Sequence, residues 1–207
     1  QREIFSFNEM VEAFDIERMS VGAPVFDIEK LNWLNGQYIR DMSASVFMDR
    51  VAEWAVNRER FRELVPLVQE RTERFIDLLP QVDYLLGERA EITQANFAHK
   101  ELTEGDCLRI LDHALRALER TQRWDRDDLF EDLKSLAEAM DIKFREFLFP
   151  LFIAISGRDV SLPLFDSLAF LGSDLTQSRI RTAIDALGGV SKKERRRLEL
   201  AFEDLDR

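Results

Sequence analysis

A short stretch of the chain concentrates side chains that contact polyanions or nucleobases. Between residues 26 and 40 it places Lys30, Trp33, Asn35, Tyr38 and Arg40. Cationic side chains donate hydrogen bonds to phosphate, and aromatic rings stack on unpaired bases. An internal Asn35-Gly36 pair is expected to break the helix at this point. For any one of these residues, burial or a solvated charge is the simpler explanation.

A second candidate is the segment from Gln69 to Phe75. Arg71 and Arg74 lie three residues apart, which places both on one helix face. Glu70 and Glu73 flank Arg71. From composition alone, an exposed helix with ion pairs is therefore favoured here over a binding site.

A third candidate lies around two apolar segments, Phe149–Gly157 and Ser161–Phe165. An aromatic ring at Phe152 could stack on an unpaired base, although its apolar neighbours favour a core position.

The end of the chain carries a basic run, Lys192-Lys193-Glu194-Arg195-Arg196-Arg197. Such a run can hold phosphate. It is followed by acids at Glu199, Glu203 and Asp204. A solvated helix with internal salt bridges is favoured, and no site is predicted there.

Composition limits the classes of protein to consider. The net charge is −11, which argues weakly against a nucleic-acid-binding protein. However, 23 of the 29 basic residues are arginine, the residue best suited to bidentate phosphate contacts. The apolar runs are too short to span a bilayer, and we expect no membrane association and no signal peptide at Gln1. A single cysteine, Cys107, excludes an intrachain disulfide and fits a reducing cytosol. One thiol and two histidines cannot form a Cys/His zinc site.

The hydrophobic pattern is helical nearly throughout, so the prediction is an all-α protein of about ten helices. Ser6 with Glu9, Asp27, and Ser43 or Ser45 are the expected helix starts in the first part. Phe47, Val51, Trp54 and Ala55 are expected on one side of the helix after Ser45. A longer helix is expected from about Arg58 to Leu79, kinked or restarted at Pro66. A connection is expected over residues 87–93.

The second part of the chain has the clearest helices. Thr103 is expected to begin an amphipathic helix with Leu108, Leu111, Leu115 and Leu118 inward and Arg109, Arg116 and Arg120 outward. Asp125 or Asp127 should cap a helix through Met140. The apolar stretch 142–155 should form the buried centre, ending at Ser156-Gly157. A further helix is expected over 163–171, with Ser161 as its cap and Gly172 at its end. Another should cover 174–187 and stop at Gly188-Gly189. A last helix should begin after a Ser191 cap.

The segment from Phe26 to Arg40 is very similar to the region that follows the catalytic domain in bacterial glutamyl-tRNA synthetases, a class I aminoacyl-tRNA synthetase family. In that family the segment lies in a helical stem-contact region on the inner side of the L-shaped tRNA. The resemblance implies that Lys30, Trp33 and Arg40 contact the tRNA, the two cations through phosphate.

The other two candidates resemble the anticodon-binding part of the same family. The family's arginine that reads the last anticodon base falls on Arg71, which implies specificity for glutamate tRNA. The arginine that normally follows Pro150-Leu151 is replaced here by Phe152, so direct base readout at that position is not expected. The resemblance also assigns the loop residues Ser161, Leu162 and Leu164 to the middle bases and Lys143 to the RNA backbone.

The resemblance covers nearly the whole chain but only the C-terminal half of the family protein. It implies a stem-contact region at 1–43 and an α-helical cage for the anticodon with subdomains at 44–90 and 91–207. Neither nucleotide-site motif of class I synthetases is present, so we expect this part alone not to activate glutamate. ATP and magnesium would belong to the parent glutamate–tRNA ligase. We expect that enzyme to be a cytoplasmic monomer with tRNA(Glu) as partner. The alternative is a helical protein-interaction or scaffold domain, which the acidic charge and Phe152 favour.

Overall fold

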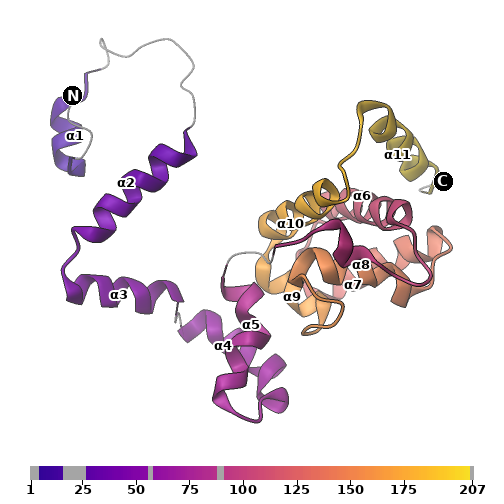
Figure 1. The fold of residues 1–207 in the computed structure, drawn as a ribbon, viewed down its shortest axis with the longest axis horizontal. Helices are drawn as coiled ribbons and strands as arrows, with labels where there is room; N and C mark the ends of the chain where they lie inside the picture. Colours follow the sequence, from indigo (N-terminus) through magenta and orange to yellow (C-terminus); the bar gives the residue numbers. More distant parts are fainter. Residues whose placement is uncertain (1–4, 16–26, 56–57, 88–90, 206–207) are drawn as a thin grey trace. The chain divides into compact units, whose positions relative to one another are not determined.

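The structure is a computed structural model that describes residues 5–15, 27–55, 58–87 and 91–205, without the side chains of 54, 55 and 58. Over these residues it contains eleven α-helices, three short 3-10 helices and no strand (Figure 1). The predicted all-α class is confirmed. The chain divides into two compact units, Gln1–Arg58 and Glu59–Arg207. The division expected at 43 and 90 stays a prediction.

The first unit contains three described helices. They are α1 (Phe7–Ala13), α2 (Ile28–Arg40) and α3 (Ala44–Ala55). Ser6 and Asp27 cap α1 and α2 by accepting hydrogen bonds from the backbone of Glu9 and Lys30, as predicted. At the start of α3 the hydroxyl of Ser43 accepts from the Val46 N–H, so Ser43 rather than Ser45 begins that helix.

The described helices of this unit present apolar side chains to solvent. α1 and α2 bury no residue. Phe47 and Val51 lie four residues apart on α3, on one side as expected, and both are exposed, while Trp54 and Ala55 lie outside the described side chains. The amphipathic pattern thus predicted the helix but not what covers its apolar face.

The expected break at Asn35-Gly36 is wrong, because α2 runs without interruption through both residues. A glycine inside a helix costs about 1 kcal/mol relative to alanine, which the remaining residues of the helix tolerate. Because Gly36 has no side chain, the guanidinium of Arg40 can lie close to its backbone. A Cβ at Gly36 would lie 3.2 Å from Nη1 of Arg40, so this guanidinium folds back over the glycine.

The second unit contains eight α-helices within its described residues. They are α4 (Arg58–Val68), α5 (Leu78–Leu86), α6 (Glu104–Arg120), α7 (Arg126–Ala139), α8 (Phe144–Ser156), α9 (Leu164–Leu171), α10 (Ser173–Ala186) and α11 (Lys192–Leu205). Figure 1 shows α6 to α10 gathered into one bundle. α8 supplies much of the core, including Phe147 and Leu151, which are fully buried. The predicted buried centre is therefore confirmed.

The buried face of α6 is rotated slightly from the predicted one. Leu111 and Leu118 are buried as expected, whereas Leu108 and Leu115 are only half-buried. Cys107, Ile110 and Ala114 complete the covered face. Four helices pack on α6, namely α7, α8, α10 and α11, so its buried face is wider than a single leucine stripe. The predicted Thr103 cap is confirmed, with Asp106 as its reciprocal partner.

The long helix predicted from Arg58 to Leu79 is wrong as a single element. α4 continues through Pro66 but ends at Val68, followed by the 3-10 helices η2 (Gln69–Arg71) and η3 (Phe75–Asp77). Proline removes one backbone donor and crowds the preceding turn, and the chain begins a new helix, α5, only at Leu78. The resulting loop, residues 69–77, carries Arg71.

The predicted helix ends in the second half are confirmed with one exception. Gly157, Gly172 and the pair Gly188-Gly189 all have positive φ, which an L residue adopts only with strain. Asp125 caps α7 through two backbone N–H groups. Ser161, however, does not cap α9, because Pro163 takes the N-cap position without a side-chain hydrogen bond. A further 3-10 helix, η4 (Gln94–Phe97), was not predicted.

Candidate functional site

One face of α2 brings together the predicted residues of the first unit. Lys30, Trp33 and Arg40 follow one another at three- and seven-residue spacings, which place them on the same side of a continuous helix. All three are exposed, Trp33 by 48%. With its amide oxygen turned toward them, Gln37 accepts hydrogen bonds from Arg40 Nη2 at 2.8 Å and from Trp33 Nε1 at 3.2 Å.

Gln37 is therefore a residue of this face that the sequence did not single out. Gln37 lies four residues after Trp33 and three before Arg40, a spacing that puts all three on one helix face and could have identified it from the sequence. The amide holds an indole and a guanidinium in fixed positions beside each other, so part of the entropy of ordering them is already lost in the free protein.

In the second unit, Arg71 lies at the end of η2 in the loop between α4 and α5. Its Nη1 donates to the backbone oxygen of Leu67 at 2.6 Å, and the Thr72 hydroxyl donates to Val68 O at 2.8 Å. These bonds satisfy carbonyls at the end of α4 that have no helical partner. Arg71 remains exposed, and a guanidinium with five N–H donors keeps others for a ligand.

The same loop is braced along its length. Arg74 makes two hydrogen bonds to the carboxylate of Asp77, at 2.8 and 2.7 Å, and Gln81 donates to the Asp77 backbone oxygen. Phe75 is nevertheless 92% exposed. Because the loop is held by its own hydrogen bonds, this ring is not free to fold onto the core.

The predicted residues around α8 and α9 differ in accessibility. The side chain of Lys143, at the start of α8, is 82% exposed and pairs with Glu146 at 3.2 Å. Phe152 is half-buried and packs against the core. Leu162 and Leu164 are each 3% exposed, so only their backbone groups remain for a contact with a base.

The loop from Ser156 to Pro163 is held in place by side chains that sequence analysis missed. The Ser156 hydroxyl lies 2.8 Å from Phe152 O and accepts from the Arg158 N–H, and the hydroxyl of half-buried Ser161 donates to Leu162 O. Buried Arg179 on α10 donates to Ile155 O at 2.7 Å.

Arg158 connects this loop to α5. Its guanidinium donates to Pro80 O and to Asp83 Oδ2, both at 2.6 Å. These partners lie 78 and 75 residues away in the sequence, and no local pattern indicates them. The two predicted recognition loops of the second unit are thereby fixed to the same framework.

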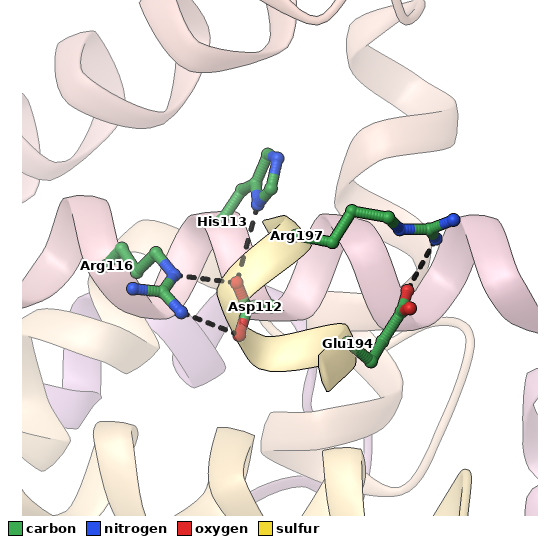
Figure 2. Close-up of polar contacts among 5 residues, drawn as sticks. All are labelled: Asp112, His113, Arg116, Glu194 and Arg197. Carbon is green, nitrogen blue, oxygen red and sulfur yellow. Dashed lines mark hydrogen bonds and ion pairs between the residues drawn. The ribbon is translucent and has the colours of Figure 1, made fainter. Parts of the chain in front are cut away.

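A second polar cluster lies between α6 and α11. Figure 2 shows Asp112 with Arg116 and His113 on α6, beside the Glu194–Arg197 pair of α11. Arg116 Nε lies 2.7 Å from Asp112 Oδ2, and His113 Nδ1 lies 3.5 Å from the same oxygen. Burial favours the neutral acid, but hydrogen bonds and charge from His113 and Arg116 outweigh it, so the pKa of Asp112 is held below its usual value.

Neither this cluster nor any other described group resembles a metal or nucleophilic centre. Among the described residues no three His, Cys, Asp or Glu side chains come together as metal ligands. Cys107 is buried, and burial raises the pKa of its thiol to about 11. None of the helices in the described ranges is long and apolar enough to cross a bilayer.

The helical bundle with two braced loops is a framework that presents exposed polar groups. The family described as anticodon binding domain matches residues 46–184. Since this match covers most of the chain, the chain belongs to that family.

The individual relatives narrow the comparison. The chain is 44% identical over 206 residues to the glutamate–tRNA ligase of Marinomonas sp. strain MWYL1, covering 99% of this chain and 42% of that protein. It is 42% identical over 205 residues to the glutamate–tRNA ligase of Alcanivorax borkumensis, again covering 99% of this chain and 42% of the relative. The chain thus spans about two-fifths of the length of the curated relatives it matches.

Solved structures support the same fold. The crystal structure of a glutamate tRNA ligase from Elizabethkingia meningosepticum, in complex with its amino acid, superposes with a TM-score of 0.55 at 22% identity. The match covers 90% of this chain and 38% of that one. At this identity the likeness concerns the fold alone.

Proposed function

We propose that this chain is the tRNA-recognising part of a bacterial-type glutamate–tRNA ligase, and that it binds tRNA(Glu) through the anticodon loop and the inner side of the L. The observation that carries the proposal is the family match over residues 46–184, together with exposed Arg71 in a braced loop of that region. A cytoplasmic enzyme acting as a monomer is the parent protein we infer.

Within this proposal the two units have different tasks. The α2 face with Lys30, Trp33 and Arg40 contacts backbone phosphates and riboses, which adds affinity but no base specificity. Arg71 donates to acceptor atoms of the third anticodon base, where a cytosine presents O2 and N3. A base with donors at these positions leaves the guanidinium without partners and is rejected.

The α8–α9 region supplies the remaining contacts. Lys143 neutralises a backbone phosphate, and the Ser161 loop meets the middle bases through hydroxyl and backbone groups, since Leu162 and Leu164 are buried. Phe152, which replaces an arginine of the family pattern, acts in the core. The boundaries at 43 and 90 remain part of the proposal.

The chemistry of aminoacylation lies outside these residues. ATP and magnesium serve adenylate formation in the parent enzyme, and no cluster of carboxylate, imidazole or thiol groups among the described residues suits a metal ion. The chain spans about two-fifths of its relatives' length, and we expect it alone not to activate glutamate.

A binding titration tests the proposal. The chain is titrated with tRNA(Glu) and with a tRNA altered at the third anticodon base, at low and high salt. We expect tighter binding to the first, and weaker binding of both at high salt, because phosphate contacts release counterions. Arg71→Gln should reduce the discrimination about tenfold or more, as expected for a lost bidentate-type contact worth roughly 1–3 kcal/mol.

A matched control is Arg74→Gln in the same loop, which removes the same charge from a guanidinium already paired with Asp77. Equal binding of both tRNAs by the unaltered chain would contradict the assignment of Arg71. Absence of any tRNA binding at low salt would favour the second candidate function, a helical protein-interaction domain. The net charge of −11 supports that candidate.

A further inference from the structure

The first half of α11 carries a concentration of positive charge that is unusual for this acidic chain. Helix α11 has the sequence KKERRRLELAFEDL, with five bases in its first six residues and its remaining acids in the second half. The chain as a whole carries −11. A helix that only needed a solvated face would not require this separation of charge.

The acids of α11 neutralise only part of this positive charge. Arg197 pairs with Glu194. Within the described part of the chain, Lys192, Lys193, Arg195 and Arg196 make no ion pair. Most of the described arginines elsewhere in the second unit do form ion pairs. Those paired with Asp or Glu are Arg62, Arg74, Arg109, Arg116, Arg123, Arg126, Arg158 and Arg181.

The arrangement also opposes the stability of the helix itself. Cations near a helix N-terminus face the positive end of the helix dipole, which is unfavourable. Lys192 and Arg196 are four residues apart, and Lys193 and Arg196 are three apart, so like charges lie next to each other. α6 and α7 each carry two acids in their first turns, whereas α11 carries one, Glu194, beside Lys192 and Lys193. A polyanion bound to α11 would remove both costs.

The rest of the protein holds this basic half in a fixed position. Leu198 and Phe202, one and two turns further along α11, are buried. The Phe202 ring meets His113 edge-on at 5.5 Å between centroids, and the Arg120 guanidinium lies 4.7 Å above it. The basic residues therefore project from a docked helix.

Arg195 extends the positive surface onto neighbouring helices. It lines a hollow of about 470 Å³ together with Arg116 and Arg181 and with two acids, Glu119 and Asp185. Leu115, Ile184 and Val190 form its apolar part. Two of the three guanidiniums are held by acids, Arg116 by Asp112 at 2.7 Å (Figure 2) and Arg181 by Glu119 at 2.6 Å.

A second hollow of about 510 Å³ is lined only by Ser191 and residues of α11, among them Lys193, Arg196, Arg197 and Glu194. Arg195 borders the first hollow and Arg196 the second, so neighbouring residues of one helix face both. A single small anion would occupy one hollow only. A chain of phosphates can follow both.

We propose that the first half of α11, with the Arg116–Arg181–Arg195 hollow, binds the phosphate backbone of tRNA at a place separate from the anticodon bases. This inference rests on the proposed function, because it takes the same RNA as ligand. The contact adds affinity that falls with salt and does not depend on the bases.

The test compares charge variants of the whole chain in tRNA titrations over a series of salt concentrations. Arg195→Gln/Arg196→Gln should weaken binding about tenfold at low salt. It should also reduce the slope of log Kd against log salt concentration by the equivalent of one to two phosphate contacts. The factor should be the same for tRNA(Glu) and for the tRNA altered at the third anticodon base. Arg195→Lys/Arg196→Lys keeps the charges and should bind within about twofold of the unaltered chain.

The control is Arg62→Gln/Arg123→Gln, which changes the net charge equally but removes exposed arginines that pair with Glu59 and Asp125. If the Arg195/Arg196 variant binds like this control while the unaltered chain binds tRNA, the α11 inference is wrong and the proposed function stands. If the unaltered chain binds no tRNA but binds polyglutamate through Arg195 and Arg196, the α11 inference and the proposed function are both wrong. The basic half of α11 then binds an acidic protein.

Discussion

The hydroxyl of Tyr84 lies 2.8 Å from that of Ser167, and both groups are buried. The bond joins α5 to α9 across 83 residues of sequence. Since α5 follows the Arg71 loop and α9 follows the Ser161 loop, this contact and the Arg158–Asp83 pair fix the two proposed recognition loops within one framework.

Tyr84→Phe should lower the free energy of unfolding by about 1 kcal/mol, the usual contribution of one hydrogen bond. Ser167 keeps a second contact, since its hydroxyl also lies 2.9 Å from Pro163 O. Urea denaturation measures the change. Tyr38→Phe is the control, because the Tyr38 hydroxyl bonds to Phe5 O at an exposed position and should cost less. Equal losses in both variants would contradict a special role for the buried pair.

Gly36→Ala should stabilise α2 by up to about 1 kcal/mol through helix propensity and yet weaken tRNA binding. A Cβ at this position meets the Arg40 guanidinium at 3.2 Å, so the side chain has to shift away from Gln37. Circular dichroism and the tRNA titration measure the two effects. Gly105→Ala in α6 has room, with the nearest atom at 3.7 Å, and should leave binding unchanged.

Stability should fall in acid partly through Asp112. The folded-state pKa of Asp112 is depressed, so its stabilising contribution is present above the unfolded pKa of about 4 and is lost as the pH falls through the folded value. Asp112→Asn should cost roughly 1–3 kcal/mol at pH 7, because Arg116 loses its partner, and should flatten the stability curve below pH 4. Thermal melts between about pH 2 and 7 test this. Asp127→Asn, at a carboxylate that is 83% exposed, should change the curve little.

Cys107 should not react with thiol reagents in the folded protein. With its pKa raised to about 11 by burial, only about one thiol in a thousand is ionised at pH 8. Mass spectrometry after iodoacetamide treatment should show no adduct until urea unfolds the chain. Fast labelling of the native protein would mean that α6 opens far more readily than its packing indicates.

The sequence by itself determined the helical class, most helix boundaries and the family. These depend on local chemistry: Ser6, Asp27, Thr103 and Asp125 cap helices with their own side chains, and the glycines at 157, 172, 188 and 189 take positive φ. Such interactions span three or four residues, so a linear pattern contains them.

Only the tertiary structure decided how the candidate residues are presented. Leu162 and Leu164 are buried although their loop was expected to meet bases, and Arg158 and Arg179 reach backbone oxygens far away in the sequence. The basic run in α11 was expected to form salt bridges within a solvated helix; one such pair, Arg197–Glu194, is present, while Lys192, Lys193, Arg195 and Arg196 make no ion pair with the described residues. Burial and pairing depend on which helices pack together, and no stretch of sequence contains that information until distant segments meet.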